Sequence, residues 1–202
     1  MSIKIRLIIM NFLQFAVWGA YLTSMGSYLV NVGLHEHIGM FYAMQGIVSL
    51  FMPAVLGIIA DRWIPAQKLL SFSHFTAALF MAAAGYYGMT KGADVDFGTL
   101  FTLYSLSVAF YMPTLALSNS VAYTALDKAG LDTIRTFPPI RIFGTIGFIC
   151  SMWVVDLLGL QNNYGQFFAC AIIGVAYGVY ALTLPELSLI HISEPTRRRG
   201  IS

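Results

Sequence analysis

FPPIRIFGTIGFICSMWVVDLL, residues 137–158, begins with two prolines and an arginine and then continues as an apolar run. A helix needs roughly 17–25 mostly apolar residues to cross the hydrocarbon core of a bilayer, and this run is long enough. Pro138 and Pro139 suit a first helical turn, where a backbone N–H has no partner and the fixed φ is already helical. We therefore expect a membrane-spanning helix over about 139–158, with Arg141 in its first turn at the membrane edge.

The rest of the chain has the same apolar character. Of its 202 residues, 58% are hydrophobic and only 10% are charged, whereas soluble domains carry about 25% charged residues. Long apolar runs lie at about 7–32, 40–60, 69–89, 98–126, 139–158 and 165–184. The predicted fold is an all-α integral membrane protein in which residues 1–186 form six transmembrane helices.

The loops between these runs differ sharply in basic residues. The first run is too long for a signal peptide and has no small-residue cleavage site, so we expect it to be retained. Leaving out the C-terminal tail, one side of the membrane would hold seven basic residues and the other only one, Lys91; the seven are Lys4, Arg6, Arg62, Lys68, Lys128, Arg135 and Arg141. By the positive-inside rule, the N-terminus is predicted to lie in the cytoplasm.

Several function classes are disfavoured by the motifs and by the short loops. No catalytic motif of the HExxH, GxSxG or P-loop type occurs, and Asp156 falls near the outer end of its run. Cys150 and Cys170 lie inside apolar runs without disulfide or zinc spacing. No basic run with interleaved aromatics indicates nucleic-acid binding. We expect no enzyme, no metal or cofactor site and no nucleic-acid partner.

The first run carries polar and aromatic side chains along one helical stripe. Asn11, Gln14, Trp18 and Tyr21 recur at helical spacing. The stripe could form a cavity wall of amides and an aromatic ring, or its amides could bond neighbouring helices within the bilayer. Both interpretations are open at this point.

The fourth run contains a proline and, almost two turns later, an amide. Pro113 predicts a kink, and Asn119 follows it. Because proline is common in membrane helices, packing is the simplest reason for it. Glycines such as Gly19 and Gly147 allow helices to approach closely and are not predicted to be sites.

Arg141, Thr145 and Phe148 share one face of the fifth predicted helix, because they are four and seven residues apart. A guanidinium, a hydroxyl and an aromatic ring in a row could bind a small polar ligand that contains a flat ring. Alternatively, Arg141 could extend to the lipid headgroups as one more membrane anchor.

Five separated motifs resemble the nucleoside:proton symporter family of the major facilitator superfamily. They are FLQFAVWGAYLTSMGSYL (12–29), FMPAVLGIIADRW (51–63), FYMPTLALSNSVAY (110–123), FPPIRIFGTIGF (137–148) and LTLPEL (182–187). The resemblance implies the N-terminal half of a twelve-helix transporter of the bacterial inner membrane. Such a transporter would carry purine and pyrimidine nucleosides together with protons, and its two halves would rock about a site at the membrane midplane.

The resemblance also implies roles for individual residues. Arg141 and Thr145 would contact polar groups of the nucleoside, and Phe148 would stack or pack on its rings. Further cavity candidates, chosen by their helical facing, are Gln14, Trp18 and Asn119. Asp61 and Arg62 match part of the superfamily's loop signature and would have a gating role, although Trp63, Ile64 and Pro65 replace its later residues.

The match to the family departs from its pattern at the C-terminal end. We interpret residues 187–202 as a non-native tail, with the start of a cytoplasmic linker as the alternative. The missing C-terminal half would supply the acidic residues for proton coupling, so the six-helix part is expected to be inactive alone. The alternative hypothesis is a complete six-helix module that acts as a homodimer or as a non-transporting binding or sensor protein.

Overall fold

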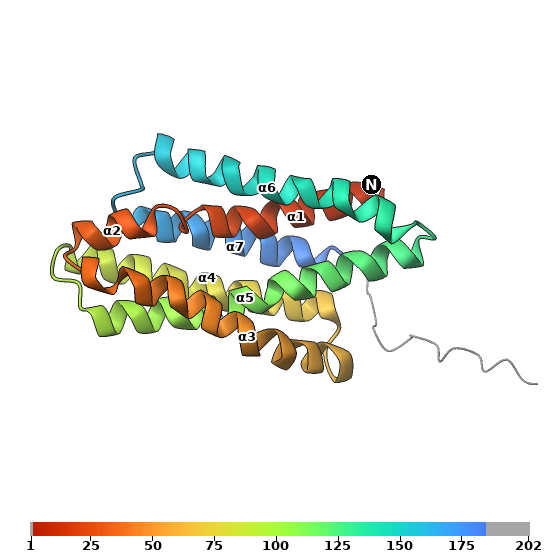
Figure 1. The fold of residues 1–202 in the computed structure, drawn as a ribbon, viewed down its shortest axis with the longest axis horizontal. Coiled ribbons are helices and arrows are strands. Elements are labelled where there is room, and N and C mark those ends of the chain that lie inside the picture. The colour runs from red at the N-terminus through yellow and green to blue at the C-terminus, as the bar shows by residue number, and fades with distance from the viewer. Residues whose placement is uncertain (1, 185–202) are drawn as a thin grey trace, which may run out of the picture.

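The computed structural model describes residues 2–184, apart from the side chain of Asp61, and this part of the chain is a bundle of antiparallel helices (Figure 1). The elements are α1 (Ile3–Gly19), α2 (Met25–Asn31), the 3₁₀ turn η1 (His35–His37), α3 (Ile38–Arg62), α4 (Ala66–Lys91), α5 (Phe97–Lys128), α6 (Thr133–Leu157) and α7 (Gly165–Leu182). The predicted tail at 187–202 lies outside the described residues.

The predicted all-α membrane fold is confirmed. Within residues 2–184, five helices, α3 to α7, are long and apolar enough to cross a membrane. The side chain of Arg6 donates a hydrogen bond to the carbonyl of Thr183 over 3.1 Å, so the chain returns after α7 to the end where it began. An even number of crossings, with α1 and α2 forming the first one, accounts for that return.

The first predicted span, 7–32, is not one continuous helix. It breaks between Gly19 and Met25, and neighbouring helices provide hydrogen bonds at the break. The hydroxyl of Tyr42 donates to the carbonyl of Leu22 over 2.8 Å, and the Ser24 hydroxyl donates to the Gln166 side chain over 2.9 Å. Such tertiary partners are what allow irregular backbone at membrane depth, and they leave no trace in the local hydrophobic pattern.

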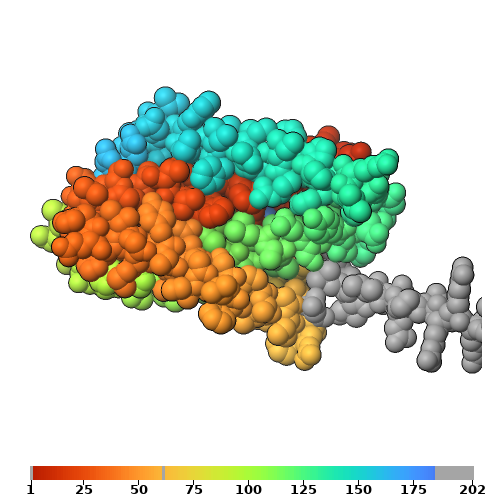
Figure 2. All heavy atoms as spheres, viewed as in Figure 1, coloured from red at the N-terminus to blue at the C-terminus, as the bar shows by residue number. Residues whose placement is uncertain are grey.

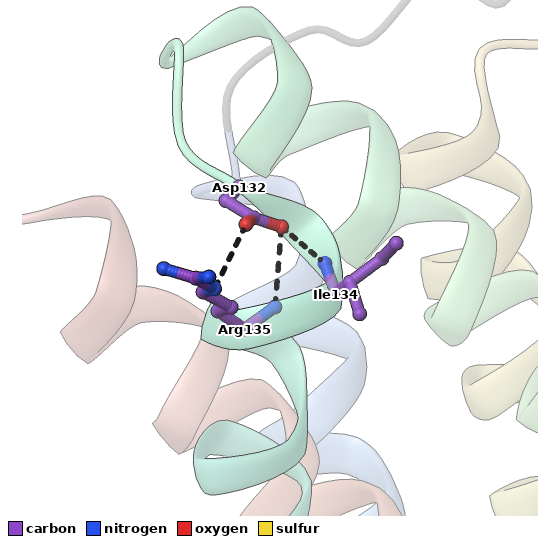
Figure 3. Close-up of polar contacts among 3 residues, drawn as sticks. All are labelled: Asp132, Ile134 and Arg135. Atoms are coloured by element: carbon purple, nitrogen blue, oxygen red, sulfur yellow. Dashed lines mark hydrogen bonds and ion pairs between the residues drawn. The ribbon is translucent and has the colours of Figure 1, made fainter.

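Helix α6 begins earlier than predicted. Asp132 caps its first turn, because one carboxylate oxygen accepts from the backbone N–H groups of Ile134 and Arg135 at 2.9 and 3.2 Å (Figure 3). The other oxygen lies 3.6 Å from Nε of Arg135. Pro138 therefore falls inside the helix, and the expectation that Arg141 lies in the first turn is wrong. Arg141 follows the helix start by eight residues, which is about 12 Å along the axis.

An aspartate cap at the start of α5 and a glycine in the left-handed conformation after its end shape the turns on either side of this helix. The Asp96 carboxylate begins α5 by accepting from the Thr99 backbone N–H over 2.8 Å, and this hydrogen bond holds the pKa of Asp96 below its usual value. Gly130 has a φ of 66° two residues after the end of α5, a conformation that costs glycine little. It turns the chain back toward Asp132 and α6.

Packing within the bundle is dominated by the pairs α1–α6, α4–α7, α4–α5 and α3–α5. The α1–α6 pair is in backbone contact through glycines. A Cβ added at Gly147 would lie 2.2 Å from the Phe12 carbonyl oxygen, and one added at Gly19 would lie 2.3 Å from the Phe148 carbonyl oxygen. This close approach brings the side chains of α1 against those of α6.

Candidate functional site

A furrow runs along one face of the bundle. Figure 2 shows α1 at its floor, with α6 along one side and α3 and α5 along the other. Side chains from these helices meet across α1, and they include Arg141, Phe148 and Trp18, which the sequence singled out.

Arg141 lies against an aromatic ring of α1. Its guanidinium carbon is 3.8 Å from the centroid of the Phe15 ring, a contact that contributes about 0.5–2 kcal/mol depending on how dry it is. Arg141 is partly buried, and Thr145, one turn further along α6, is exposed. Both line an open groove with Phe137, Pro138 and Ile142. The groove therefore has a fixed cation and a hydroxyl side by side.

Trp18 joins α1 to both sides of the furrow. Its ring meets Phe148 of α6 edge-on, with centroids 6.2 Å apart and planes at 86°. Its indole N–H donates to the side-chain oxygen of Gln45 of α3 over 2.8 Å. Phe15 lies 6.2 Å from Trp18 on the same helix. We call Arg141, Phe15, Trp18, Phe148 and Gln45 the furrow cluster.

Gln14 lies behind the furrow and not on its surface. It is fully buried, and its side-chain N–H donates to the Thr114 hydroxyl of α5 over 2.9 Å. The Tyr111 hydroxyl donates to the Gln14 backbone carbonyl over 2.6 Å. Of the two interpretations open for this amide, its contacts are those of a bond between helices.

The remaining candidates lie apart from the furrow cluster. Asn119 is partly exposed on α5, five residues after Thr114, and within the described residues no hydrogen bond or ring contact joins it to the cluster. Arg62 is exposed at the end of α3, and the Asp61 side chain lies outside the described part of the structure. The gating role of these two residues stays a prediction.

Two members of the furrow cluster were not singled out from the sequence. Gln45 stands alone as an amide in the apolar run 40–60, and it was a detectable signal of a buried polar contact. Phe15 gave no such signal, because an aromatic residue in a membrane helix is unremarkable until a cation is found over its ring.

Gln45 should hold the Trp18 ring in place. We expect Gln45→Leu to lower the free energy of unfolding by about 1–3 kcal/mol, because the indole N–H would lose its partner in a partly buried site. The same change in a Trp18→Phe background should cost less, since no N–H remains there. A double-mutant cycle, measured by unfolding in detergent, tests the coupling.

The matched control for that cycle is Ser49→Ala, one turn away on α3. Its hydroxyl donates to the Gln45 backbone carbonyl of its own helix, over 2.7 Å, so it should not couple to Trp18. Equal costs of Gln45→Leu in both backgrounds would show that the hydrogen bond does not position the ring.

The chain is similar to known transport proteins over nearly its whole length. A family profile described as nucleoside H⁺ symporter matches residues 1–194. The chain is 41% identical to xanthosine permease of Escherichia coli (strain K12) over 192 residues and 40% identical to the nucleoside permease NupG of the same organism over 191. Each match covers 93% of this chain and 44% of the relative.

Solved structures agree with these relatives. The crystal structure of a point mutant of the nucleoside transporter NupG superposes with a TM-score of 0.87 at 36% identity, covering 97% of this chain and 48% of that one. A second crystal structure of NupG gives a TM-score of 0.83 at 38% identity, covering 93% and 45%. The chain thus spans about half the length of the proteins it matches.

Proposed function

Because the chain belongs to the nucleoside H⁺ symporter family, we propose that it forms half of the cavity of a membrane transporter that carries nucleosides together with protons. The furrow cluster is the observation that carries this proposal. It brings one cation and three aromatic rings into mutual contact on α1 and α6, two of the helices that border the furrow.

The chemistry of the furrow cluster suits a nucleoside. A nucleoside has a sugar with several hydroxyl groups and a flat base that carries hydrogen-bond acceptors. Arg141 offers up to five N–H donors in a rigid plane, and the Phe15 ring beneath it restricts its orientation. We propose that Arg141 and Thr145 bind polar groups of the nucleoside and that Phe148 packs on its rings.

Trp18 is proposed to act as a wall and not as a hydrogen-bond donor. Its single N–H is already used by Gln45, so only the faces and edges of the indole remain for contact. Aromatic rings in offset or edge-on contact add about 0.5–1.5 kcal/mol beyond the area they bury. Asn119, also on a helix that borders the furrow, stays a cavity candidate, and Gln14 is proposed to support the floor.

The second half of the cavity is proposed to come from further chain of the kind that the relatives possess. The matched relatives are more than twice as long as the matched segment, which covers 44% of them. In the described residues, large apolar side chains are exposed along α3 and α6, on both sides of the furrow; they include Ile47, Leu50, Phe51, Ile142, Ile146 and Trp153. We propose that a second six-helix half covers the furrow and supplies the proton-binding carboxylates.

A homodimer is not favoured over this arrangement. The superposition with a TM-score of 0.87 places this chain on less than half of one longer polypeptide. The partner half in that protein is therefore a continuation of the same chain, and not a second copy of these residues.

The orientation in the membrane is proposed from charge. Lys4 and Arg6 begin the chain at the end where the α3–α4 and α5–α6 connections also lie (Figure 1). Lys68 lies in the first turn of α4 and Lys128 ends α5, next to these connections, so basic residues gather at one end of the bundle. We propose that this end faces the cytoplasm of a bacterial inner membrane, with Asp61 and Arg62 gating it.

Uptake measurements test the function. The chain would be expressed with the remaining part of a homologous permease, as one fused polypeptide, in a bacterial host that lacks its own nucleoside permeases. Labelled uridine and xanthosine should accumulate, and a proton uncoupler should abolish the accumulation. The chain alone and the added part alone are the controls. A fused protein that inserts in the membrane but accumulates neither nucleoside would contradict the proposal.

A further inference from the structure

His74 is a buried polar side chain that the furrow does not use. It lies within α4, and only 1% of its surface is exposed. Its Nδ1 is 2.9 Å from the Leu70 carbonyl oxygen, four residues earlier in the same helix. Since a carbonyl only accepts, Nδ1 must carry the hydrogen. In the neutral ring Nε2 is then a bare acceptor.

Nε2 of His74 lacks a hydrogen-bond partner among residues 2–184. Tyr177 packs edge-on against the ring at 4.1 Å between centroids, and Tyr111 does so at 5.8 Å. Neither forms a hydrogen bond with Nε2. Buried acceptors in native proteins are nearly always satisfied, by protein or by ordered water.

A small cavity adjoins the ring at the junction of α1, α4, α5 and α7. Besides His74, its polar lining comes from Tyr21, Ser107, Tyr111 and Cys170. The space open to a water-sized molecule is about 10 Å³, close to the minimum that holds one water. Nothing larger than water fits there.

The hydroxyl groups of Ser107 and Tyr111 in this cavity can each accept a further hydrogen bond. Ser107 already donates its hydrogen to the Ala77 carbonyl over 2.8 Å, and Tyr111 donates to the Gln14 carbonyl over 2.6 Å. Each oxygen keeps a lone pair for another donor. A molecule with two hydrogens to donate would therefore satisfy both Nε2 and one of these oxygens.

We propose that this cavity binds one ordered water, which donates one hydrogen bond to Nε2 of His74 and the other to the Ser107 or Tyr111 hydroxyl. The water would connect α4 with α5, and through the Tyr111–Gln14 bond with the helix that forms the floor of the furrow. This binding site is independent of the proposed transport function.

Water suits the site better than an added proton on the ring. The titratable groups beside His74 are Tyr21 from the break after α1, Tyr111 from α5, and Cys170 and Tyr177 from α7. None of them is a carboxylate, so a buried imidazolium would have no counter-ion among the described residues, and such an unpaired charge is strongly disfavoured.

Hydroxyl-radical footprinting by X-ray radiolysis tests the site, because radicals formed from a bound water oxidise the side chains beside it. Met81 lines the cavity and is 2% exposed, whereas Met10 and Met25 do not line it and are 0% exposed. In the purified chain, Met81 should oxidise several-fold faster than those two methionines. Equal oxidation of all three would overturn the proposal.

Two variants identify His74 as the group that holds the water. His74→Phe keeps a ring of similar size without nitrogen atoms, and the excess oxidation of Met81 should disappear. Tyr177→Phe keeps the ring that packs on His74 and removes only its hydroxyl; Tyr177 does not line the cavity, so the excess should remain. Excess oxidation that persists in His74→Phe would overturn the assignment. If that variant fails to fold, the wild-type comparison of Met81 with Met10 and Met25 still decides.

Discussion

Replacing Arg141 with alanine is expected to lower the apparent affinity for nucleosides at least tenfold in the fused transporter described above. A hydrogen bond to a charged group contributes about 1.5–3 kcal/mol, and about 1.4 kcal/mol corresponds to a factor of ten. Arg141→Lys should recover only part of the loss, because an ammonium keeps the charge but not the planar stack on Phe15. Concentration-dependent uridine uptake measures both variants.

Arg135→Ala is the matched control for Arg141. It removes an arginine from the same helix, but this side chain is 89% exposed and pairs with the cap residue Asp132. An exposed pair of this kind contributes about 0–1 kcal/mol, so uptake should be unchanged. Unaltered uptake in Arg141→Ala, with normal amounts of protein in the membrane, would remove Arg141 from the binding site.

Replacing Gly147 with alanine is expected to destabilise the bundle by about 1–3 kcal/mol or more, as overpacking of a close contact does. The added Cβ would lie 2.2 Å from the Phe12 carbonyl oxygen. A backbone carbonyl cannot rotate away as a side chain can, so α1 must move away from α6. Unfolding in detergent measures the loss of stability.

The same substitution should also weaken nucleoside uptake in the fused transporter. Phe148 follows Gly147 directly, and its ring meets Trp18 across the α1–α6 contact. Separation of the two helices would therefore disturb the furrow cluster as well as the fold.

Gly46→Ala is the control for Gly147→Ala. Gly46 lies in α3, and a Cβ there meets no atom within 4 Å. Alanine is favoured over glycine in a helix by about 1 kcal/mol, so this variant should be as stable as the wild type or more so. Equal stability of Gly147→Ala and Gly46→Ala would show that the α1–α6 contact is looser than the structure indicates.

Local sequence patterns were sufficient to locate most of the long helices. Apolar runs of bilayer length predicted α3, α4, α5 and α7 to within a few residues. They did not locate the start of α6 or the break after α1, because a capping side chain or hydrogen bonds from distant residues determine the backbone conformation there. Asp132 caps α6 before its prolines, and Tyr42 and Gln166 bind groups at the break after α1.

The candidate site was also predicted only in part from the sequence. The spacing of Arg141, Thr145 and Phe148 was enough to place them on one face of a helix, because helical geometry links residues four and seven apart. What that face meets was decided by the tertiary structure alone. Phe15 lies under Arg141, and Gln45 holds Trp18, while Gln14 is turned away toward Thr114.

The sequence does not reveal how each helix is rotated about its axis, because the helices of a membrane protein are surrounded by lipid and not by water. In water, a polar stripe separates the exposed face of a helix from the buried one. In a bilayer, lipid and protein interior are both apolar, so hydrophobicity barely distinguishes the two faces. The sequence by itself therefore determined that the chain forms membrane-spanning helices and which side chains share a face. Glycine contacts and interhelical hydrogen bonds, which exist only in the packed bundle, decided how each helix is rotated and which residues meet in the furrow.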